Sequence, residues 1–135
     1  DGVDQTNITA TAPATGSPVV GVAFTAPASG RVRLQVNGTP RVVSPASGAT
    51  YLGVMVRTGA TLGAGTLVYD GANLTTEPGC RLIVQGYIGW MQASVSTILE
   101  ALTPGAVYNA TLYHFVGSGT NGQILARGVG VDPLP

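Results

Sequence analysis

The side chains that could carry out acid–base, nucleophilic or metal chemistry are few in this sequence. It contains one histidine, His114, and one cysteine, Cys80. Hydrolytic triads and metal sites draw on several His, Cys or carboxylate groups held close together. His114 stands between Tyr113 and Phe115 in an apolar, strand-like run, so we expect a hydrogen-bonded histidine of a sheet or an interface. Cys80 has no partner for an internal disulfide and is expected to be a small buried apolar residue.

The acidic side chains offer no pair suited to glycoside hydrolysis, which needs two carboxyl groups flanking one bond. Beyond the first few residues they are Asp70, Glu77, Glu100 and Asp132, and none stands beside another. The glycine-rich run at 59–65 lacks the lysine that a phosphate-binding loop requires. The sequence therefore predicts no catalytic residue, no metal site and no cofactor, and we expect that the protein is not an enzyme.

One aromatic cluster, Tyr87 and Trp90 with Met91, has the chemistry to stack a sugar ring or to fill a pocket in a partner. In a regular strand Tyr87 and Trp90 would lie on opposite faces, and a single tryptophan is most often part of a core or an interface. Trp90 is therefore a candidate for surface recognition, with a structural role as the alternative.

The charge content is unusually low. Charged residues make up 9% of the 135 residues, there is no lysine, and the formal net charge is zero, against about 25% charged residues in an average soluble domain. A chain with little charge lacks the self-repulsion that keeps molecules apart, so we expect copies or partners to cover much of its surface. The alternative is that Thr, Ser, Asn and Gly solvate the surface. Arginine in place of every lysine, with abundant Ala, Gly and Pro, also indicates a GC-rich gene.

The sequence also argues against nucleic acids and membranes as partners. The six arginines are scattered along the chain, whereas phosphate binding needs clustered cations. No apolar run approaches the ~18 residues of a membrane span, and no basic amphipathic helix is evident. We therefore expect neither nucleic-acid binding nor membrane insertion.

The clearest secondary-structure signal is the stretch 19–36, where apolar residues alternate with small or polar ones in two halves. This period of two predicts a pair of strands, each with one buried face. The turn between them falls at 27–30, which begins with proline and ends with glycine. Asn37-Gly38 predicts a second hairpin turn, followed by a short returning strand over 40–44 at a sheet edge, because it begins with proline.

Further strands are predicted along the rest of the chain, separated by turn residues. For 93–102 a short helix is the alternative, but the Val, Ser, Thr and Ile content favours a strand. Pro104-Gly105 occupies the centre of a type II turn, and the loop 73–80 closes with Pro78-Gly79. The predicted strands are 50–57, 67–69, 82–85, 87–95, 107–116 and 123–131.

These elements predict an all-β fold of eight or nine strands, a sandwich or a barrel. Residues 1–18 are rich in Thr, Ala and Pro and poor in bulky apolar residues, so they are interpreted as an extended arm or linker without a core of its own. Residues 19–135 are predicted to form a single β-sandwich domain.

Two segments carry a resemblance to a known group of proteins. The run VAFTAPASGRVRLQV at 22–36 resembles a strand pair in the jelly-roll modules of the tumour necrosis factor and complement globular-head superfamily. ALTPGAVYNATLYH at 101–114, followed by ILARGVGVDPL at 124–134, is similar to the entry into their last two core strands. With only two Phe, the chain is more similar to the small jelly-roll domains of bacteriophage tail fibres and capsid surfaces. The resemblance implies a jelly-roll-like antiparallel sandwich and a homotrimer.

The functional hypothesis is a non-enzymatic structural protein on the exterior of a bacteriophage particle. It would be the trimeric head domain of a tail fibre or minor tail protein, in contact with other virion proteins and with a glycan or receptor on the host surface. The arm would tether the domain, and the loops at 59–66, 71–79 and 117–122 would face the host. The alternatives are a capsid decoration protein that cements capsomers and a carbohydrate-binding module. The expected subunit interface comprises Tyr51, Met55, Tyr113 and Phe115.

Overall fold

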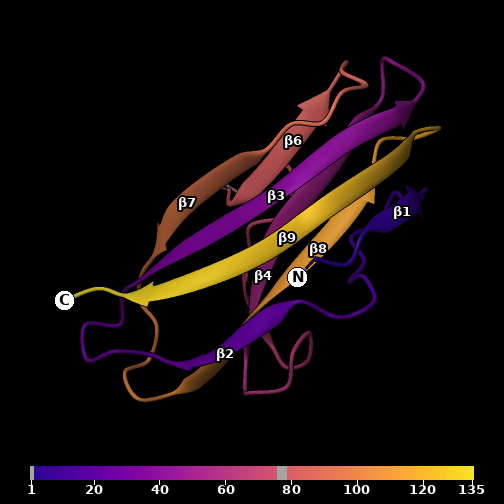
Figure 1. Ribbon diagram of the computed structural model, residues 1–135. Coiled ribbons are helices and arrows are strands. Elements are labelled where there is room, and N and C mark those ends of the chain that lie inside the picture. The colour runs from indigo at the N-terminus through magenta and orange to yellow at the C-terminus, as the bar shows by residue number, and fades with distance from the viewer. Residues whose placement is uncertain (1, 76–78) are drawn as a thin grey trace.

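The computed structural model describes residues 2–75 and 79–135, and the described chain is all-β. Its nine strands form two antiparallel sheets that lie one over the other, which confirms the predicted β-sandwich (Figure 1). The strands are β1 (Gln5–Ile8), β2 (Gly21–Thr25), β3 (Val32–Ser44), β4 (Ala49–Thr58), β5 (Leu67–Asp70), β6 (Arg81–Gln85), β7 (Ala93–Leu99), β8 (Val107–Val116) and β9 (Asn121–Pro133).

The first sheet has the strand order β1-β9-β3-β7, and the second has the order β2-β8-β4-β5 with β6 also paired to β4. The strand β4 is central in the second sheet. One of its edges pairs with β8 along nearly its whole length. The other edge is shared, because β6 pairs with its first half, 49–53, and β5 with its second half, 55–57.

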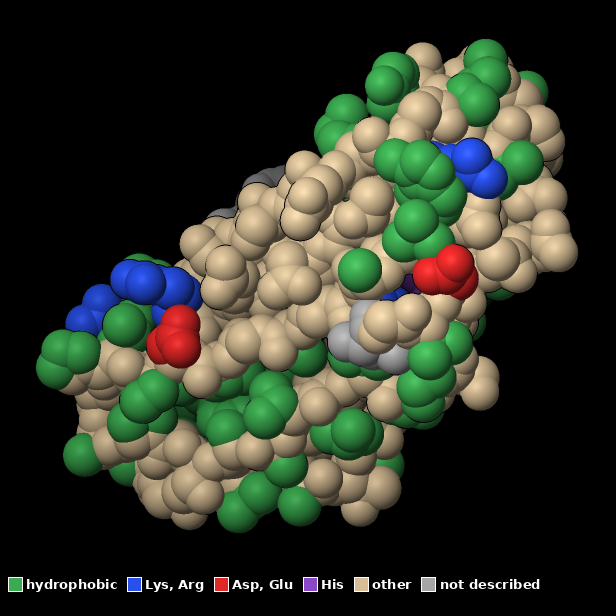
Figure 2. All heavy atoms as spheres, in the orientation of Figure 1, with side chains coloured by type: hydrophobic (Ala, Val, Ile, Leu, Met, Phe, Trp, Pro, Cys, Tyr) green, Lys and Arg blue, Asp and Glu red, His purple; other side chains and the backbone are tan. Residues whose placement is uncertain are grey.

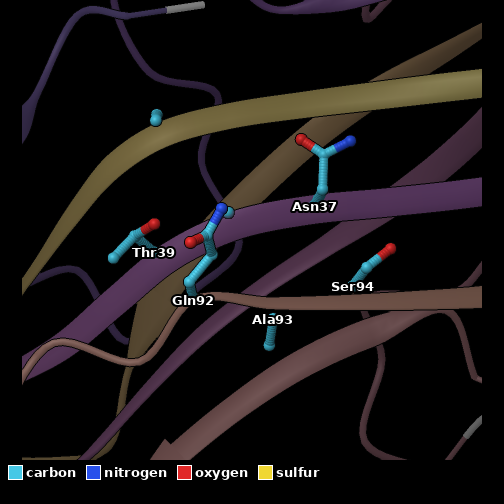
Figure 3. A pocket seen from close by; sticks show the side chains of 7 residues that line it. Asn37, Thr39, Gln92, Ala93 and Ser94 are labelled. Carbon is cyan, nitrogen blue, oxygen red and sulfur yellow. The ribbon is translucent and has the colours of Figure 1, made fainter.

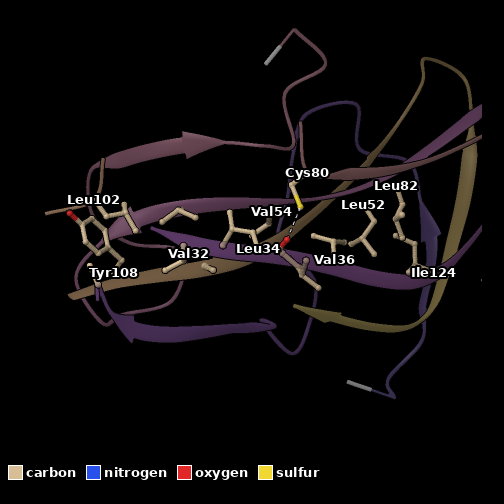
Figure 4. Close-up of a cluster of buried hydrophobic side chains, with 14 of the residues drawn as sticks. Val32, Leu34, Val36, Leu52, Val54, Cys80, Leu82, Leu102, Tyr108 and Ile124 are labelled. Carbon is tan, nitrogen blue, oxygen red and sulfur yellow. Dashed lines mark hydrogen bonds between the residues drawn. The ribbon is translucent and has the colours of Figure 1, made fainter. Parts of the chain in front are cut away.

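The alternation predicted for the first hairpin places its apolar side chains in the core. In β3, Val32, Leu34 and Val36 are at most 1% exposed, while the intervening Arg33 and Gln35 face solvent. The core fills the space between the two sheets, where inward side chains of β3, β4, β6, β8 and β9 meet (Figure 4). Burying a side chain of this size contributes roughly 1.5–3 kcal/mol. This core fixes which side of each strand faces outward.

The predicted hairpin at Asn37-Gly38 is wrong, and so is the separate returning strand over 40–44. The strand β3 continues through both, paired with β9 almost to its end. Gly38 does not take a positive φ; instead, a Cβ at this position would lie 2.7 Å from Leu52 Cδ2. The glycine is needed because β4 packs closely beneath it. Pro40 fits because β7 pairs only with 32–38, so its missing N–H removes no bond to that strand.

The strand predicted over 87–95 is also wrong in its first part, since regular pairing begins only at Ala93. From there the structure confirms the strand interpretation of the segment in which a helix was the alternative, because β7 runs through 93–99. The predicted strands over 50–57, 67–69, 82–85 and 107–116 are confirmed to within two residues at each end. The last strand begins two residues earlier and ends two later than predicted.

The turn before β8 is confirmed as well. Gly105 has a φ of +76°, and the N–H of Ala106 donates to the carbonyl of Thr103 at 3.1 Å. These are the features of a type II turn with proline and glycine at its centre. Of the predicted loop over 73–80, Pro78 lies outside the described residues.

The segment interpreted as an arm is extended, and it packs against its own domain. β1 pairs with β9, and Ile8 is buried in the main core. Two residues later the chain passes to the other sheet, where the carbonyl of Ala10 accepts from Val116 N–H and Ala14 bonds with His114 in both directions. The arm therefore bridges the two sheets along one side of the sandwich.

Candidate recognition surface

The single histidine lies inside the sandwich. His114 is 7% exposed, and its Nδ1 has no hydrogen-bond partner among the described residues. Burial and, as a smaller contribution, the positive charge of Arg127 lower the pKa of His114 from 6.5 to about 4. Arg127 is itself 1% exposed and donates from Nη2 to the carbonyl of Pro18 at 2.6 Å. At neutral pH His114 is therefore an uncharged histidine enclosed between β8, β9 and the arm.

The single cysteine is a core residue. Cys80 is fully buried, and its Sγ lies 3.9 Å from the carbonyl oxygens of Leu34 and Val95 (Figure 4). Burial raises the pKa of its thiol to about 11, although backbone hydrogen bonds act in the opposite direction. The thiol is thus protonated and screened from solvent at neutral pH, as expected for a structural cysteine.

Within 2–75 and 79–135 no group of three or more His, Cys, Asp or Glu side chains could hold a metal ion. Glu77 lies outside the described residues, whereas Glu100 pairs with Arg31 at 3.1 Å on the surface. The described chain also contains no helix with the length and apolar character needed to cross a membrane.

The four residues expected at a subunit interface lie together on the outer face of the second sheet. The rings of Tyr51 and Phe115 stack with centroids 4.5 Å apart, and Met55 and Tyr113 belong to the same cluster. Ala72, from the loop after β5, packs onto them, and three of the four predicted residues are less than 9% exposed. A hollow of about 500 Å³ remains beside the cluster, bounded by the arm on one side and by 70–74 on another.

Four large exposed apolar residues gather in the loop 86–92, which we call the apolar loop. Tyr87, Ile88 and Met91 are 50%, 50% and 42% exposed. The loop follows the last part of β3, because Val42 N–H donates to the carbonyl of Tyr87 and Met91 N–H to that of Pro40. These bonds hold four large apolar side chains, Trp90 included, at one end of the sandwich.

Trp90 is fixed by a charged neighbour. The guanidinium of Arg41 lies over its indole ring at 4.2 Å from the ring centroid, a cation–π contact. Arg41 in turn donates from Nε to Oε1 of Gln123 at 2.9 Å. The indole is nevertheless 38% exposed, so it is held in place while part of it remains accessible. The structure thus places Trp90, the predicted recognition residue, at the surface.

Next to Trp90 the outer face of the first sheet is hollowed. The hollow measures about 370 Å³, and its polar lining side chains are Asn37, Thr39, Gln92 and Ser94. Figure 3 shows these four projecting to one side of the sheet, whereas Ala93 points away from them. Along the same face Gln35 donates from Nε2 to Ser94 Oγ at 3.0 Å.

We call this polar hollow, together with Gln35, the polar face. It is not predicted from the sequence, because Asn37 is assigned to a turn there. The signal that could have found it is the alternation in β3, which continues past Gly38: the odd positions 33–41 are all polar. Figure 2 shows the result as a broad band with few hydrophobic side chains across the middle of the molecule, over β3 and β9.

Comparisons with known proteins identify no relative: no protein-family model matches the chain, and no curated protein matches it significantly.

Proposed function

We propose that the protein is a non-enzymatic head domain on the exterior of a bacteriophage particle, where it contacts the host surface. The observation that carries this proposal is the apolar loop beside the uncharged polar face. Soluble monomers seldom leave several large apolar side chains together in water. Four such residues, Tyr87, Ile88, Trp90 and Met91, lie within five consecutive positions here, and each is at least 38% exposed. We infer that another molecule packs against this apolar surface when the protein functions.

The strand order supports a jelly-roll version of the sandwich. Consecutive strands alternate between the sheets from β1 to β4, and the last two strands lie in different sheets. Interleaved Greek keys produce such alternation. The resemblance of 22–36 and 101–134 implies the same architecture, so the strand order supports the jelly-roll part of the proposal.

Within the particle we propose a homotrimer. The surface that the chain would bring to such an assembly is nearly neutral. It also carries a stacked aromatic pair, Tyr51 and Phe115, beside an open hollow of about 500 Å³. A neighbouring subunit that enters this hollow would contact Met55 and Tyr113, and it would also meet Arg57 and Asp70 at the lining. The arm bridges the two sheets and bounds this hollow through Pro13, and in the proposed assembly it tethers the domain.

The experiment is to measure mass and host attachment with the same preparations. Light scattering coupled to size exclusion should give three times the chain mass of 13.6 kDa, and the trimer should persist on dilution. Fluorescently labelled protein should then sediment with some members of a panel of GC-rich bacteria. The double variant Tyr87→Ser/Ile88→Ser should remain trimeric but lose attachment, whereas the control Leu67→Ser, which changes an exposed residue of β5, should keep both properties.

Three outcomes contradict the proposal. If the protein is a monomer that attaches to no cells, both the trimer and the host contact are refuted. Binding to expanded capsid shells in place of cells would assign the chain to capsid decoration. Attachment that survives the double variant would show that the apolar loop is not the contact.

A further inference from the structure

We propose that the polar face beside Trp90 binds an uncharged glycan chain, the neutral polysaccharide of a cell surface being its ligand class. This inference rests on the proposed function and specifies what the head domain recognises. It also assigns separate roles to two neighbouring surfaces. The glycan chain lies along the polar face of the sheet, and the apolar loop contacts the host surface at the end of the sandwich.

The first argument is the chemistry of the hollow. Asn37 and Gln92 carry amides, which both donate and accept hydrogen bonds, and Thr39 and Ser94 carry hydroxyls that do the same. Sugar hydroxyls are likewise donors and acceptors at once, so such a lining matches them in either orientation. The hollow of about 370 Å³ lies within the range of small-ligand sites.

The second argument is the aromatic residue that Arg41 of β3 holds. Trp90 lies two residues from Gln92, and Arg41, which holds its ring, follows Thr39 by two positions on the outward side of β3. A pyranose ring presents a face of C–H groups, and an accessible indole is the side chain best suited to pack against such a face. Because Arg41 is itself bonded to Gln123, the platform is fixed before a ligand arrives, which reduces the entropy lost on binding.

The third argument is the shape of the face beyond the hollow. On β9, Gly128 and Gly130 stand opposite Asn37 and Gln35 and present no side chains. From Gln35 to Arg41 the face extends about 20 Å at ~3.3 Å per residue, which accommodates several sugar rings. The proposed groove follows this strip without β9 side chains, which suits an extended chain better than a single small molecule.

The fourth argument is electrostatic. Between Gln35 and Thr39 the outward residues of β3 are uncharged, and so are their partners on β7 and β9. At one end of this stretch Arg33 stands opposite Asp132, so that charges of both signs cancel. A nucleic acid or an acidic polysaccharide needs a row of cations, and this face does not offer one. The single cation at the other end, Arg41, is held by Gln123 and Trp90, so the uncharged stretch between the two ends matches a neutral glycan.

The test uses the intact chain and a panel of neutral hexasaccharides built from glucose, mannose, galactose or N-acetylglucosamine. Trp90 is the only tryptophan, so a change in its fluorescence on titration reports on this site alone. We expect at least one hexasaccharide to shift the emission and to give saturable heat in calorimetry, with longer oligomers binding more tightly than the corresponding disaccharide.

Variants then locate the site. Asn37→Ala and Gln92→Ala should each weaken binding roughly fivefold to tenfold by removing hydrogen bonds, and Trp90→Ala should abolish the heat while Trp90→Phe retains part of it. Gly130→Val should block the groove without unfolding the chain, because a Cβ there meets only Gln35, at 3.8 Å or more. Val107→Ala is the control, since it removes an exposed apolar side chain at the start of β8, in the other sheet. Circular dichroism and thermal unfolding verify that each variant is folded.

The inference fails if no hexasaccharide shifts the Trp90 emission or gives heat at millimolar concentration. It also fails if acidic polysaccharides bind more tightly than neutral ones, or if Val107→Ala and Trp90→Ala weaken binding equally. None of these results affects the trimer or cell attachment measured above, so the glycan site can be refuted while the proposed function stands.

Discussion

The enclosed His114 makes the stability of the protein depend on pH in a defined window. The folded chain holds the imidazole at a pKa of about 4, against 6.5 in an unperturbed histidine. Between these values the unfolded chain binds a proton that the folded chain does not, so the free energy of unfolding falls as the pH is lowered. At 1.36 kcal/mol per pKa unit, the full effect is about 3 kcal/mol. It is complete near pH 4 and absent above about pH 7.

The assay is urea denaturation at a series of pH values from 7.5 to about 4, on the wild type and on His114→Gln, which cannot take up this proton. Because carboxylates titrate equally in both proteins, the difference between the two unfolding free energies isolates His114. We expect that difference to change by about 3 kcal/mol in favour of His114→Gln as the pH falls. The imidazole resonance, the only one in the chain, should titrate with a midpoint near 4 in the folded protein. Parallel pH profiles for the two proteins, or a midpoint near 6.5, would refute the reasoning.

Three further predictions concern single positions. Leu52→Ala, at a fully buried side chain, should lower the free energy of unfolding by about 2–5 kcal/mol in urea; a change within error would show that the core does not pack as described. Gly105→Ala should cost about 1–2 kcal/mol through its φ of +76° alone, since no atom lies within 4 Å of the added Cβ; a neutral result would mean that the turn relaxes. Cys80 should react with a thiol reagent only at the rate of unfolding, because its thiol is buried and its pKa is about 11; rapid labelling of the native protein would contradict this.

The period-two pattern was enough to predict most strands, because in a two-sheet core each strand has one buried face. The pattern failed where the same residue type suits either a turn or close packing between the two sheets. Asn37-Gly38 has the composition of a hairpin turn, yet Gly38 is required by the close approach of Leu52 from the opposite sheet. Only the three-dimensional packing distinguishes these uses, since the local sequence is the same in both.

The recognition surface was predictable in part. Trp90 was identified as a candidate from its residue type alone, and the structure places it at the surface. The polar face is not predicted, because Asn37 is assigned to a turn and the other lining side chains come from β7 and from the loop between β6 and β7, which are distant in sequence from β3. The apolar loop was assigned to a strand because Tyr, Ile, Trp and Met are residues that usually enter a core, and its exposure follows from pairing that begins only at Ala93.

The last strand has a consequence for aggregation. Beyond its short pairing with β1, β9 has an edge that no other strand covers among the described residues from Leu125 to Pro133. Such an edge normally recruits strands from other molecules into fibrils, and many proteins protect it with lysine, which this chain lacks. Here Ala126, at a φ of +41°, kinks the strand where its register with β3 shifts, and Pro133 ends the edge. The kink, Asp132 and Pro133 thus interrupt this edge in a chain without lysine, so straightening the kink should favour edge-to-edge pairing between molecules.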